Sequence, residues 1–134
     1  MRTKPSLTAG DAAKMMAACK AEAAKNKWDV CIAIVDEGGY LLALERMDGA
    51  HLLTPEAAIG KARTAALMKK PSRLMEERIN SRPAFLRFPE IMPVIGGVPV
   101  LHDGECIGGI GVAGVQSDED EQVAQAGADA LSKT

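Results

Sequence analysis

The sequence predicts an α+β domain with helices on both faces of an antiparallel sheet. Residues 29–46 read as a strongly apolar strand, an acidic Gly-Gly turn and a second strand, which together form a hairpin. The pattern of residues 98–115 predicts a second hairpin, and helical patterns precede, separate and follow the two hairpins. The order helix, hairpin, two helices, hairpin, helix contains no repeat and no linker, so we expect one domain over residues 1–134.

The composition limits both the core and the partners. Of the 134 residues, 47% are hydrophobic but only 3% are aromatic, and the formal net charge is -2. The core must therefore consist of Ala, Val, Ile, Leu and Met. With few rings and a near-neutral charge, the chain has no base-stacking platform and no phosphate groove, so we expect no nucleic-acid partner. No apolar run approaches the roughly 18 residues of a membrane span, so we also expect no membrane partner.

The cysteines and the first residues indicate the compartment. Polar residues interrupt positions 8–20, so no hydrophobic signal-peptide core is present there. The three cysteines are widely separated, lack a CxxC spacing and lie in apolar segments; they are Cys19, Cys31 and Cys106. We interpret them as buried thiols in a reducing compartment, and we expect the protein in the cytoplasm.

The first half of the chain begins with an amphipathic helix. Ser6 or Thr8 is the expected N-cap. One helix face is apolar or small and carries Ala12, Met16, Cys19 and Ala23. Residues 29–35 are apolar at both odd and even positions, which predicts a central strand covered on both faces.

The next predicted helix has a clear start. Thr54 is the expected N-cap, Pro55 the first helical residue and Glu56 an acid at the positive end of the dipole. A stripe of small residues follows: Ala58, Ala62, Ala65 and Ala66. Pro71 ends this helix, and a shorter helix is expected over residues 73–80.

The second half of the chain is rich in turn residues. Residues 81–93 carry three prolines and both phenylalanines, which predicts an ordered loop and a candidate lid. Asp103 and Gly104 form a favoured type I′ turn, and Pro99 places the shorter arm of this hairpin at a sheet edge. Ser117 is the expected N-cap of the last helix, whose first turn is acidic.

The run Gly109–Gly114 matches the GxGxxG pattern of dinucleotide-binding folds. A Rossmann unit also requires a βαβ continuation with an acidic residue about twenty positions further on, and the sequence offers only a helix. We therefore interpret these glycines as strand positions at which a missing side chain allows a helix or a ligand to approach closely.

Five residues are candidates for chemistry. Arg46, Met47, Asp48 and His51 follow the second predicted strand and combine an anion binder, a thioether, an acid and an imidazole. The alternative is that Arg46 and Asp48 form an ion pair that fixes the turn, while His51 is solvated. Lys61 lies within the small-residue helix, where it either extends to solvent or points its ammonium into a ligand pocket.

An ordered set of motifs then resembles the GlcG/HbpS-like family over nearly the whole chain. The motifs lie at residues 35–39 (VDEGG), 46–50 (RMDGA), 61–65 (KARTA), 96–99 (GGVP), 103–114 and 120–124 (DEQVA). Members are also called heme-degrading-domain proteins, and the same domain is fused to some corrinoid adenosyltransferases.

The resemblance implies a profilin-like or roadblock-like, three-layer domain with a five-stranded antiparallel sheet. It also implies homo-oligomers, from dimers up to octamers, and heme as the cofactor of some members. The pocket that it implies is lined by Arg46, Asp48, Lys61, Gly96, Gly97, Gly111 and Gly114. If heme binds, His51 is the expected axial ligand and Met47 the second choice, while Arg46 or Lys61 pairs with a propionate.

Three functional hypotheses follow. The first is a cytoplasmic homo-oligomer that binds a small ligand, with heme binding or heme degradation as its specific form. The second is an enzyme of small-carboxylate or aromatic catabolism, with Lys61 or His51 as general base, Asp48 as orienting group and Arg46 as carboxylate clamp. The third is an oligomeric scaffold without a ligand, which would be favoured if Gly96, Gly97 and Gly111 were packed under a helix with no cavity beside them.

Overall fold

A four-stranded antiparallel sheet with the order β2-β1-β4-β3 forms the centre of the computed structural model, which describes residues 1–132. The elements are α1 (Ala9–Lys25), β1 (Cys31–Asp36), β2 (Leu41–Arg46), α2 (Thr54–Met68), α3 (Ser72–Ser81), the 3₁₀ helix η1 (Pro83–Arg87), β3 (Gly97–His102), β4 (Glu105–Ala113) and α4 (Ser117–Ser132). The α+β prediction is confirmed. The expectation of five strands is wrong for the described residues, because the two hairpins supply four strands and the proline-rich segment between them forms η1 and a loop.

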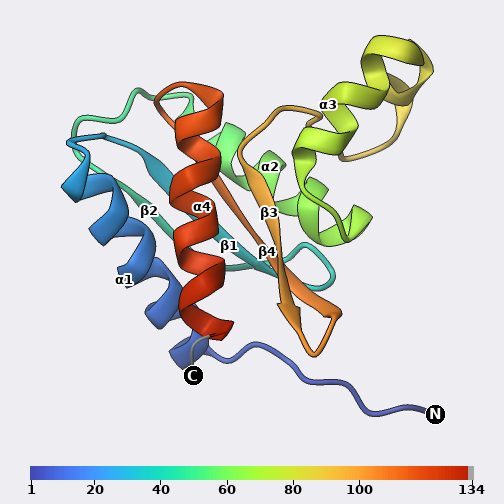
Figure 1. Cartoon of the computed structure of the whole chain (residues 1–134), viewed down its shortest axis with the longest axis horizontal. Coiled ribbons are helices and arrows are strands. Elements are labelled where there is room, and N and C mark those ends of the chain that lie inside the picture. Colours follow the sequence, from blue (N-terminus) through green and yellow to red (C-terminus); the bar gives the residue numbers. More distant parts are fainter. Residues whose placement is uncertain (133–134) are drawn as a thin grey trace.

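The helices form one layer on each face of the sheet. Helices α1 and α4 lie side by side on one face, and α2 crosses the other face, closest to β4 (Figure 1). Helix α3 and η1 extend away from these layers, at the upper right of the view (Figure 1). None of the helices in the described part of the chain is long and apolar enough to cross a membrane.

Strand β1 is buried on both faces, as its apolar pattern predicts. Ile32 and Ile34 belong to the larger core cluster, which the sheet forms with α1 and α4. Ala33 and Val35 belong to a smaller cluster with the alanines of α2. The strand lies between β2 and β4, so it is central in the sheet as well as covered on both sides.

The glycines of the GxGxxG run lie in and just after β4, which confirms the strand interpretation. A Cβ atom on Gly109 would be 2.5 Å from the carbonyl oxygen of Ala62 in α2. Only a strand without side chains at such positions lets the helix lie so close to the sheet. The alanine stripe of α2 is used for the same contact, since Ala58, Ala62, Ala65 and Ala66 are all buried.

Two of the three helix caps differ from their prediction. Thr8 caps α1 in a capping box with Asp11, which resolves the choice between Ser6 and Thr8. Thr54 is not a cap but the first residue of α2, and its buried hydroxyl donates a hydrogen bond of 2.7 Å to the carbonyl oxygen of His51. Ser117, the expected cap of α4, is likewise the first residue of the helix. The Glu119 carboxylate accepts a hydrogen bond of 3.2 Å from the N–H of Gln116, the residue before Ser117.

The second hairpin has the turn that its sequence predicts. Asp103 and Gly104 have φ angles of 49° and 78°, the left-handed conformation that a type I′ turn requires at both positions. Strand β3 is an edge strand, which agrees with Pro99 in its middle.

Candidate functional site

The candidate site is a pocket of about 340 Å³ between the start of α2, the start of α4 and residues 92–94. Its lining is mostly apolar, but four of the side chains are ionisable: His51, Glu56, Lys61 and Asp120. The other lining residues are Leu53, Ala57, Met92, Val94, Ala113, Gly114, Val115 and Ser117. Three residues expected to bind a ligand, His51, Lys61 and Gly114, line this pocket, although Gly114 is far from the other two in sequence.

Lys61 neither extends to solvent nor carries an unpaired charge. Its side chain is buried, with the residue only 4% exposed, and its Nζ donates to the carbonyl oxygen of Val112 at 3.0 Å. The same Nζ donates to Oδ2 of Asp120 at 3.1 Å. Asp120 is 2% exposed, so the two form a buried ion pair in the wall of the pocket. They are the two buried charged side chains among residues 1–132.

The environment of Asp120 acts on its charge in opposite directions. Burial raises the pKa of the Asp120 carboxyl, because removal from water disfavours the charged form. The Lys61 ammonium and a hydrogen bond of 3.1 Å from the Val115 N–H to Oδ1 oppose this shift of the pKa. The ionised state of Asp120 therefore depends on Lys61.

The predicted glycines mostly position Lys61 rather than line the pocket. Gly96 has a φ of +135°, and a Cβ atom on it would be 2.8 Å from both Cδ and Nζ of Lys61. A Cβ atom on Gly97 would be 2.2 Å from the Lys61 carbonyl oxygen. Gly111 lies under α2 in the same way, so among the four glycines Gly114 is the one that lines the pocket.

The run from Arg46 to His51 divides between the pocket and other places. His51 is exposed at the rim of the pocket. Arg46 and Asp48 are exposed, do not line it, and form no ion pair with each other in the part of the chain that the structure describes. Met47 packs against the core cluster on the α1 and α4 side.

Three residues of the pocket were not singled out from the sequence. The local sequence assigns Asp120 and Glu56 to the dipoles of their helices, and the motif at residues 120–124 gives Asp120 no role in the site. Asp120 stands three residues before Val123 and seven before Gly127, on the buried face of α4. That periodicity was the available signal. Met92 lies in the proline-rich segment, where its N–H donates to the Thr64 hydroxyl at 2.6 Å, and nothing in the local sequence indicates this contact.

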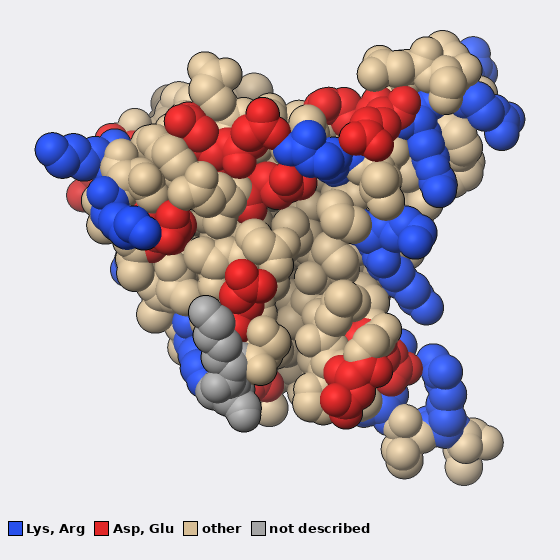
Figure 2. All heavy atoms as spheres, viewed as in Figure 1, with Lys and Arg blue, Asp and Glu red and all other residues tan. Residues whose placement is uncertain are grey.

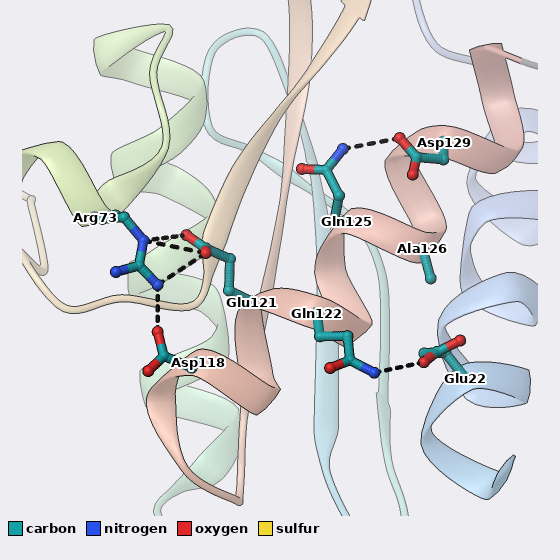
Figure 3. A pocket seen from close by; sticks show the side chains of 8 residues that line it. All are labelled: Glu22, Arg73, Asp118, Glu121, Gln122, Gln125, Ala126 and Asp129. Carbon is teal, nitrogen blue, oxygen red and sulfur yellow. Dashed lines mark hydrogen bonds and ion pairs between the residues drawn. The ribbon is translucent and has the colours of Figure 1, made fainter. Parts of the chain in front are cut away.

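A second depression, of about 490 Å³, is polar and lies along α4 (Figure 3). Arg73 on α3 pairs with Asp118 and, at 3.0 Å, with Glu121. Gln122 donates to Glu22 on α1 at 2.7 Å. Acidic side chains gather over the start of α4 and over α3, with a basic side chain between them (Figure 2). The Arg73 contacts therefore join α3 to α4, and the Gln122–Glu22 hydrogen bond joins α1 to α4. No group of three metal-ligating residues occurs within the described residues.

A four-stranded antiparallel sheet between helical layers, with an apolar pocket at the helix starts, defines an α+β domain able to hold a small ligand. The chain belongs to the HbpS-like family: the model described as haem degrading protein HbpS-like matches residues 7–129.

Individual relatives agree with this assignment. The chain is 44% identical over 114 residues to protein GlcG of Escherichia coli K12, covering 84% of this chain and 85% of that protein. It is 27% identical over 132 residues to an uncharacterised 15.0 kDa protein from the dhaT-dhaS intergenic region of Citrobacter freundii, covering 95% of this chain and 93% of that protein.

Solved structures give the same fold. A double mutant of HbpS from Streptomyces reticuli has a TM-score of 0.91 and 36% identity, over 98% of this chain and 90% of that chain. A PduOC:heme complex has a TM-score of 0.86 and 26% identity, over 94% of this chain and 95% of that chain.

Proposed function

We propose that this protein binds a small, largely apolar ligand in the pocket below His51, and that heme is the ligand to test first. The observation that carries the proposal is the combination of apolar walls, such as Ala57, Val94 and Val115, with an imidazole at the rim. The HbpS-like family and the heme complex of PduOC favour a tetrapyrrole among apolar ligands.

The residues present fit heme in their donor set. The His51 ring has no hydrogen-bond or ion-pair partner among residues 1–132, so its nitrogens are free to ligate iron. Met92 brings a thioether to the pocket, whereas Met47 packs into the core. Bound heme would supply an iron with exchangeable axial positions.

The size of the pocket determines how heme would lie. A volume of about 340 Å³ is near the lower end of the roughly 300–1,000 Å³ typical of ligand pockets. A porphyrin would therefore not be fully enclosed by the pocket, whose lining includes the apolar side chain of Leu53, a residue that is 66% exposed. Heme burial would cover this apolar surface.

The test is a hemin titration of the wild-type protein and of two single variants. The chain has two histidines, and His102 is exposed at the tip of the β3–β4 hairpin, so His102→Ala is a matched control for His51→Ala. We expect a shifted Soret band for the wild type and His102→Ala, and a weaker or absent shift for His51→Ala. An unshifted band in the wild type at micromolar heme, or identical bands in all three proteins, contradicts the proposal.

An enzyme that acts on a small carboxylate or aromatic compound is the second candidate. The observation that favours it is the burial of Lys61 at the pocket, beside His51 and Asp120. Arg46 and Asp48 lie outside the pocket, so neither acts there as clamp or orienting group. Lys61 is an ammonium paired with Asp120, so His51 is the general base of this candidate and Lys61 its cationic group. Deuterium incorporation into pyruvate in D₂O, followed by NMR, tests this candidate: exchange should exceed the buffer rate and be lost in His51→Ala, and an exchange rate equal to that of the buffer contradicts proton abstraction from this carboxylate.

We further propose that the protein forms homo-oligomers through the β2 edge. Strand β2 is an edge strand with three exposed leucines, Leu41, Leu42 and Leu44, whereas the small-residue stripe of α2 is already buried against the sheet. Light scattering should give a mass above that of one chain, reduced in Leu44→Lys. A wild-type monomer contradicts this proposal and, with it, the ligand-free oligomeric scaffold.

We propose the cytoplasm as the compartment. Cys19, Cys31 and Cys106 are buried free thiols, which is typical of proteins in reducing surroundings. Fractionation of cells should recover the protein with cytoplasmic markers, and recovery outside the cytoplasm contradicts the proposal.

A further inference from the structure

The Lys61–Asp120 pair has hydrogen-bonding capacity that the described bonds leave unused. A lysine ammonium has three N–H donors, and Lys61 uses two, to Val112 O and Asp120 Oδ2. Each oxygen of the Asp120 carboxylate has two lone pairs and accepts one of the described bonds. Both residues line the pocket, so a donor and an acceptor are adjacent in its wall.

A gain in folding stability does not by itself explain why Lys61 and Asp120 are buried as an ion pair. Removing two opposite charges from water costs as much free energy as their attraction returns, and well-packed apolar residues are often equally or more stable. The other charged side chains of residues 1–132 avoid this cost because they are at least partly exposed. This pair is buried next to a cavity, where a ligand is able to reach it.

We propose that Lys61 and Asp120 bind a hydroxyl group, an alcohol or a phenol, at one end of an otherwise apolar ligand. A hydroxyl group is both a donor and an acceptor, so its oxygen accepts from Lys61 Nζ while its proton is donated to Asp120. The remaining apolar body of the ligand lies against Ala57, Val94 and Val115. This inference rests on the pocket as the binding site proposed above, and not on heme as its ligand.

Other ligand ends match the pair less well. A carboxylate has no proton to donate to Asp120, and it is repelled by the charges of Asp120 and Glu56, which also lines the pocket. A hydrocarbon end would remove water from Lys61 and Asp120 without replacing its hydrogen bonds, which is unfavourable. An ether or ketone oxygen accepts from Lys61 but has no proton to donate to Asp120.

The experiment compares four probes with the same ring: phenol, anisole, toluene and benzoate. Each is titrated into the ¹⁵N-labelled wild-type protein while the amide signals of Gly114, Val115 and Asp120 are followed by NMR. We expect phenol to shift these signals and to bind at least about tenfold more tightly than toluene, since one hydrogen bond to a charged group is worth that much. Anisole and benzoate should both bind more weakly than phenol.

Two results overturn the inference in distinguishable ways. If toluene or anisole binds as tightly as phenol at these signals, the hydroxyl preference is wrong, although the pocket still binds apolar ligands. If no probe shifts these signals, both the inference and the proposed pocket are wrong. Failure of heme to bind while phenol is preferred leaves the inference standing. In Lys61→Met/Asp120→Leu the preference for phenol over toluene should disappear; if that variant does not fold, the ranking in the wild type decides.

Discussion

Gly111 on β4 lies directly beneath the carbonyl oxygen of Ala58 on α2, so that a Cβ atom on Gly111 would be 2.0 Å from that oxygen. The same Cβ atom would be 2.4 Å from the backbone nitrogen of Ala62. Both atoms belong to the helix backbone, so no side-chain rotation relieves the overlap. The distance between α2 and the sheet, and with it the position of Lys61, therefore depends on the missing side chain of Gly111.

The substitution Gly111→Ala should lower the free energy of unfolding by about 3 kcal/mol or more, at the upper end of the range for overpacked cores, because α2 must move as a whole. Urea unfolding measures the change. Gly10→Ala is the control, because a Cβ atom there meets only the Thr8 hydroxyl oxygen, at 3.6 Å, and alanine favours the helix. Equal stability of the two variants contradicts the close packing of α2 on β4.

Helices α1 and α4 depend on a similar close contact. A Cβ atom on Gly127 would be 2.4 Å from the Sγ of Cys19 and 3.1 Å from the carbonyl oxygen of Met15. Gly127→Ala should therefore destabilise the protein by about 1–3 kcal/mol, although alanine is the better helix former. In a Cys19→Ala background the same substitution should be less costly, because the sulfur is gone. A double-mutant cycle without coupling between the two positions contradicts this explanation.

The Lys61–Asp120 pair should respond asymmetrically to substitution. Lys61→Met leaves an unpaired carboxylate buried, and we expect a loss of about 3–5 kcal/mol at neutral pH. Lys61→Met/Asp120→Leu removes both charges and should recover most of that loss. A double variant that is less stable than Lys61→Met contradicts the buried-pair description. Urea unfolding of the three proteins gives the ranking.

The stability of the Lys61→Met variant should also depend on pH. Burial already raises the pKa of Asp120, and without the Lys61 ammonium the pKa rises further. A carboxyl group whose pKa is higher in the folded state than its unfolded value of 3.8 contributes stability below that value, and this contribution is lost as the pH rises through the folded pKa. Lys61→Met should therefore lose stability from about pH 4 towards neutrality, relative to the double variant. Parallel pH profiles of the two proteins would exclude Asp120 as the titrating group.

Much of the fold could be predicted because local patterns determine it. The two-sided apolar pattern of residues 29–35 predicts a central covered strand, which the structure has as β1, and Asp103-Gly104 predicts the second hairpin. The cap of α2 could not be predicted, because Thr54 hydrogen-bonds the His51 carbonyl instead, a choice that depends on how the preceding loop folds. The number of strands was taken from the resemblance, and the hairpins of the chain itself give four.

Only part of the candidate site could be predicted from the sequence. His51 and Lys61 were candidates by chemistry, but Asp120 is 59 residues from Lys61, and an acid in a first helical turn is usually solvated. Met47 is the thioether that the sequence places beside Arg46 and Asp48, yet in the fold it packs against the core and Met92 lines the pocket. Contacts between elements that are distant in sequence decide these questions, and a single sequence does not contain them.

The buried thiol of Cys19 should ionise and react less readily in the folded protein than in the unfolded one. Burial raises the pKa of the Cys19 thiol from 9.0 to about 12, because the thiolate would be removed from water between α1 and α4. Below pH 9 the Cys19 thiol is protonated in both the folded and the unfolded protein, so it does not affect the free energy of unfolding. As the pH rises from about 9 towards 12, the thiol ionises only in the unfolded protein, and this lowers the free energy of unfolding. Native Cys19 should also resist iodoacetamide at mildly alkaline pH, since the thiolate is the nucleophile, and react fully in urea. Peptide mass spectrometry measures the modification; equal rates for the native and unfolded protein would show that Cys19 is accessible.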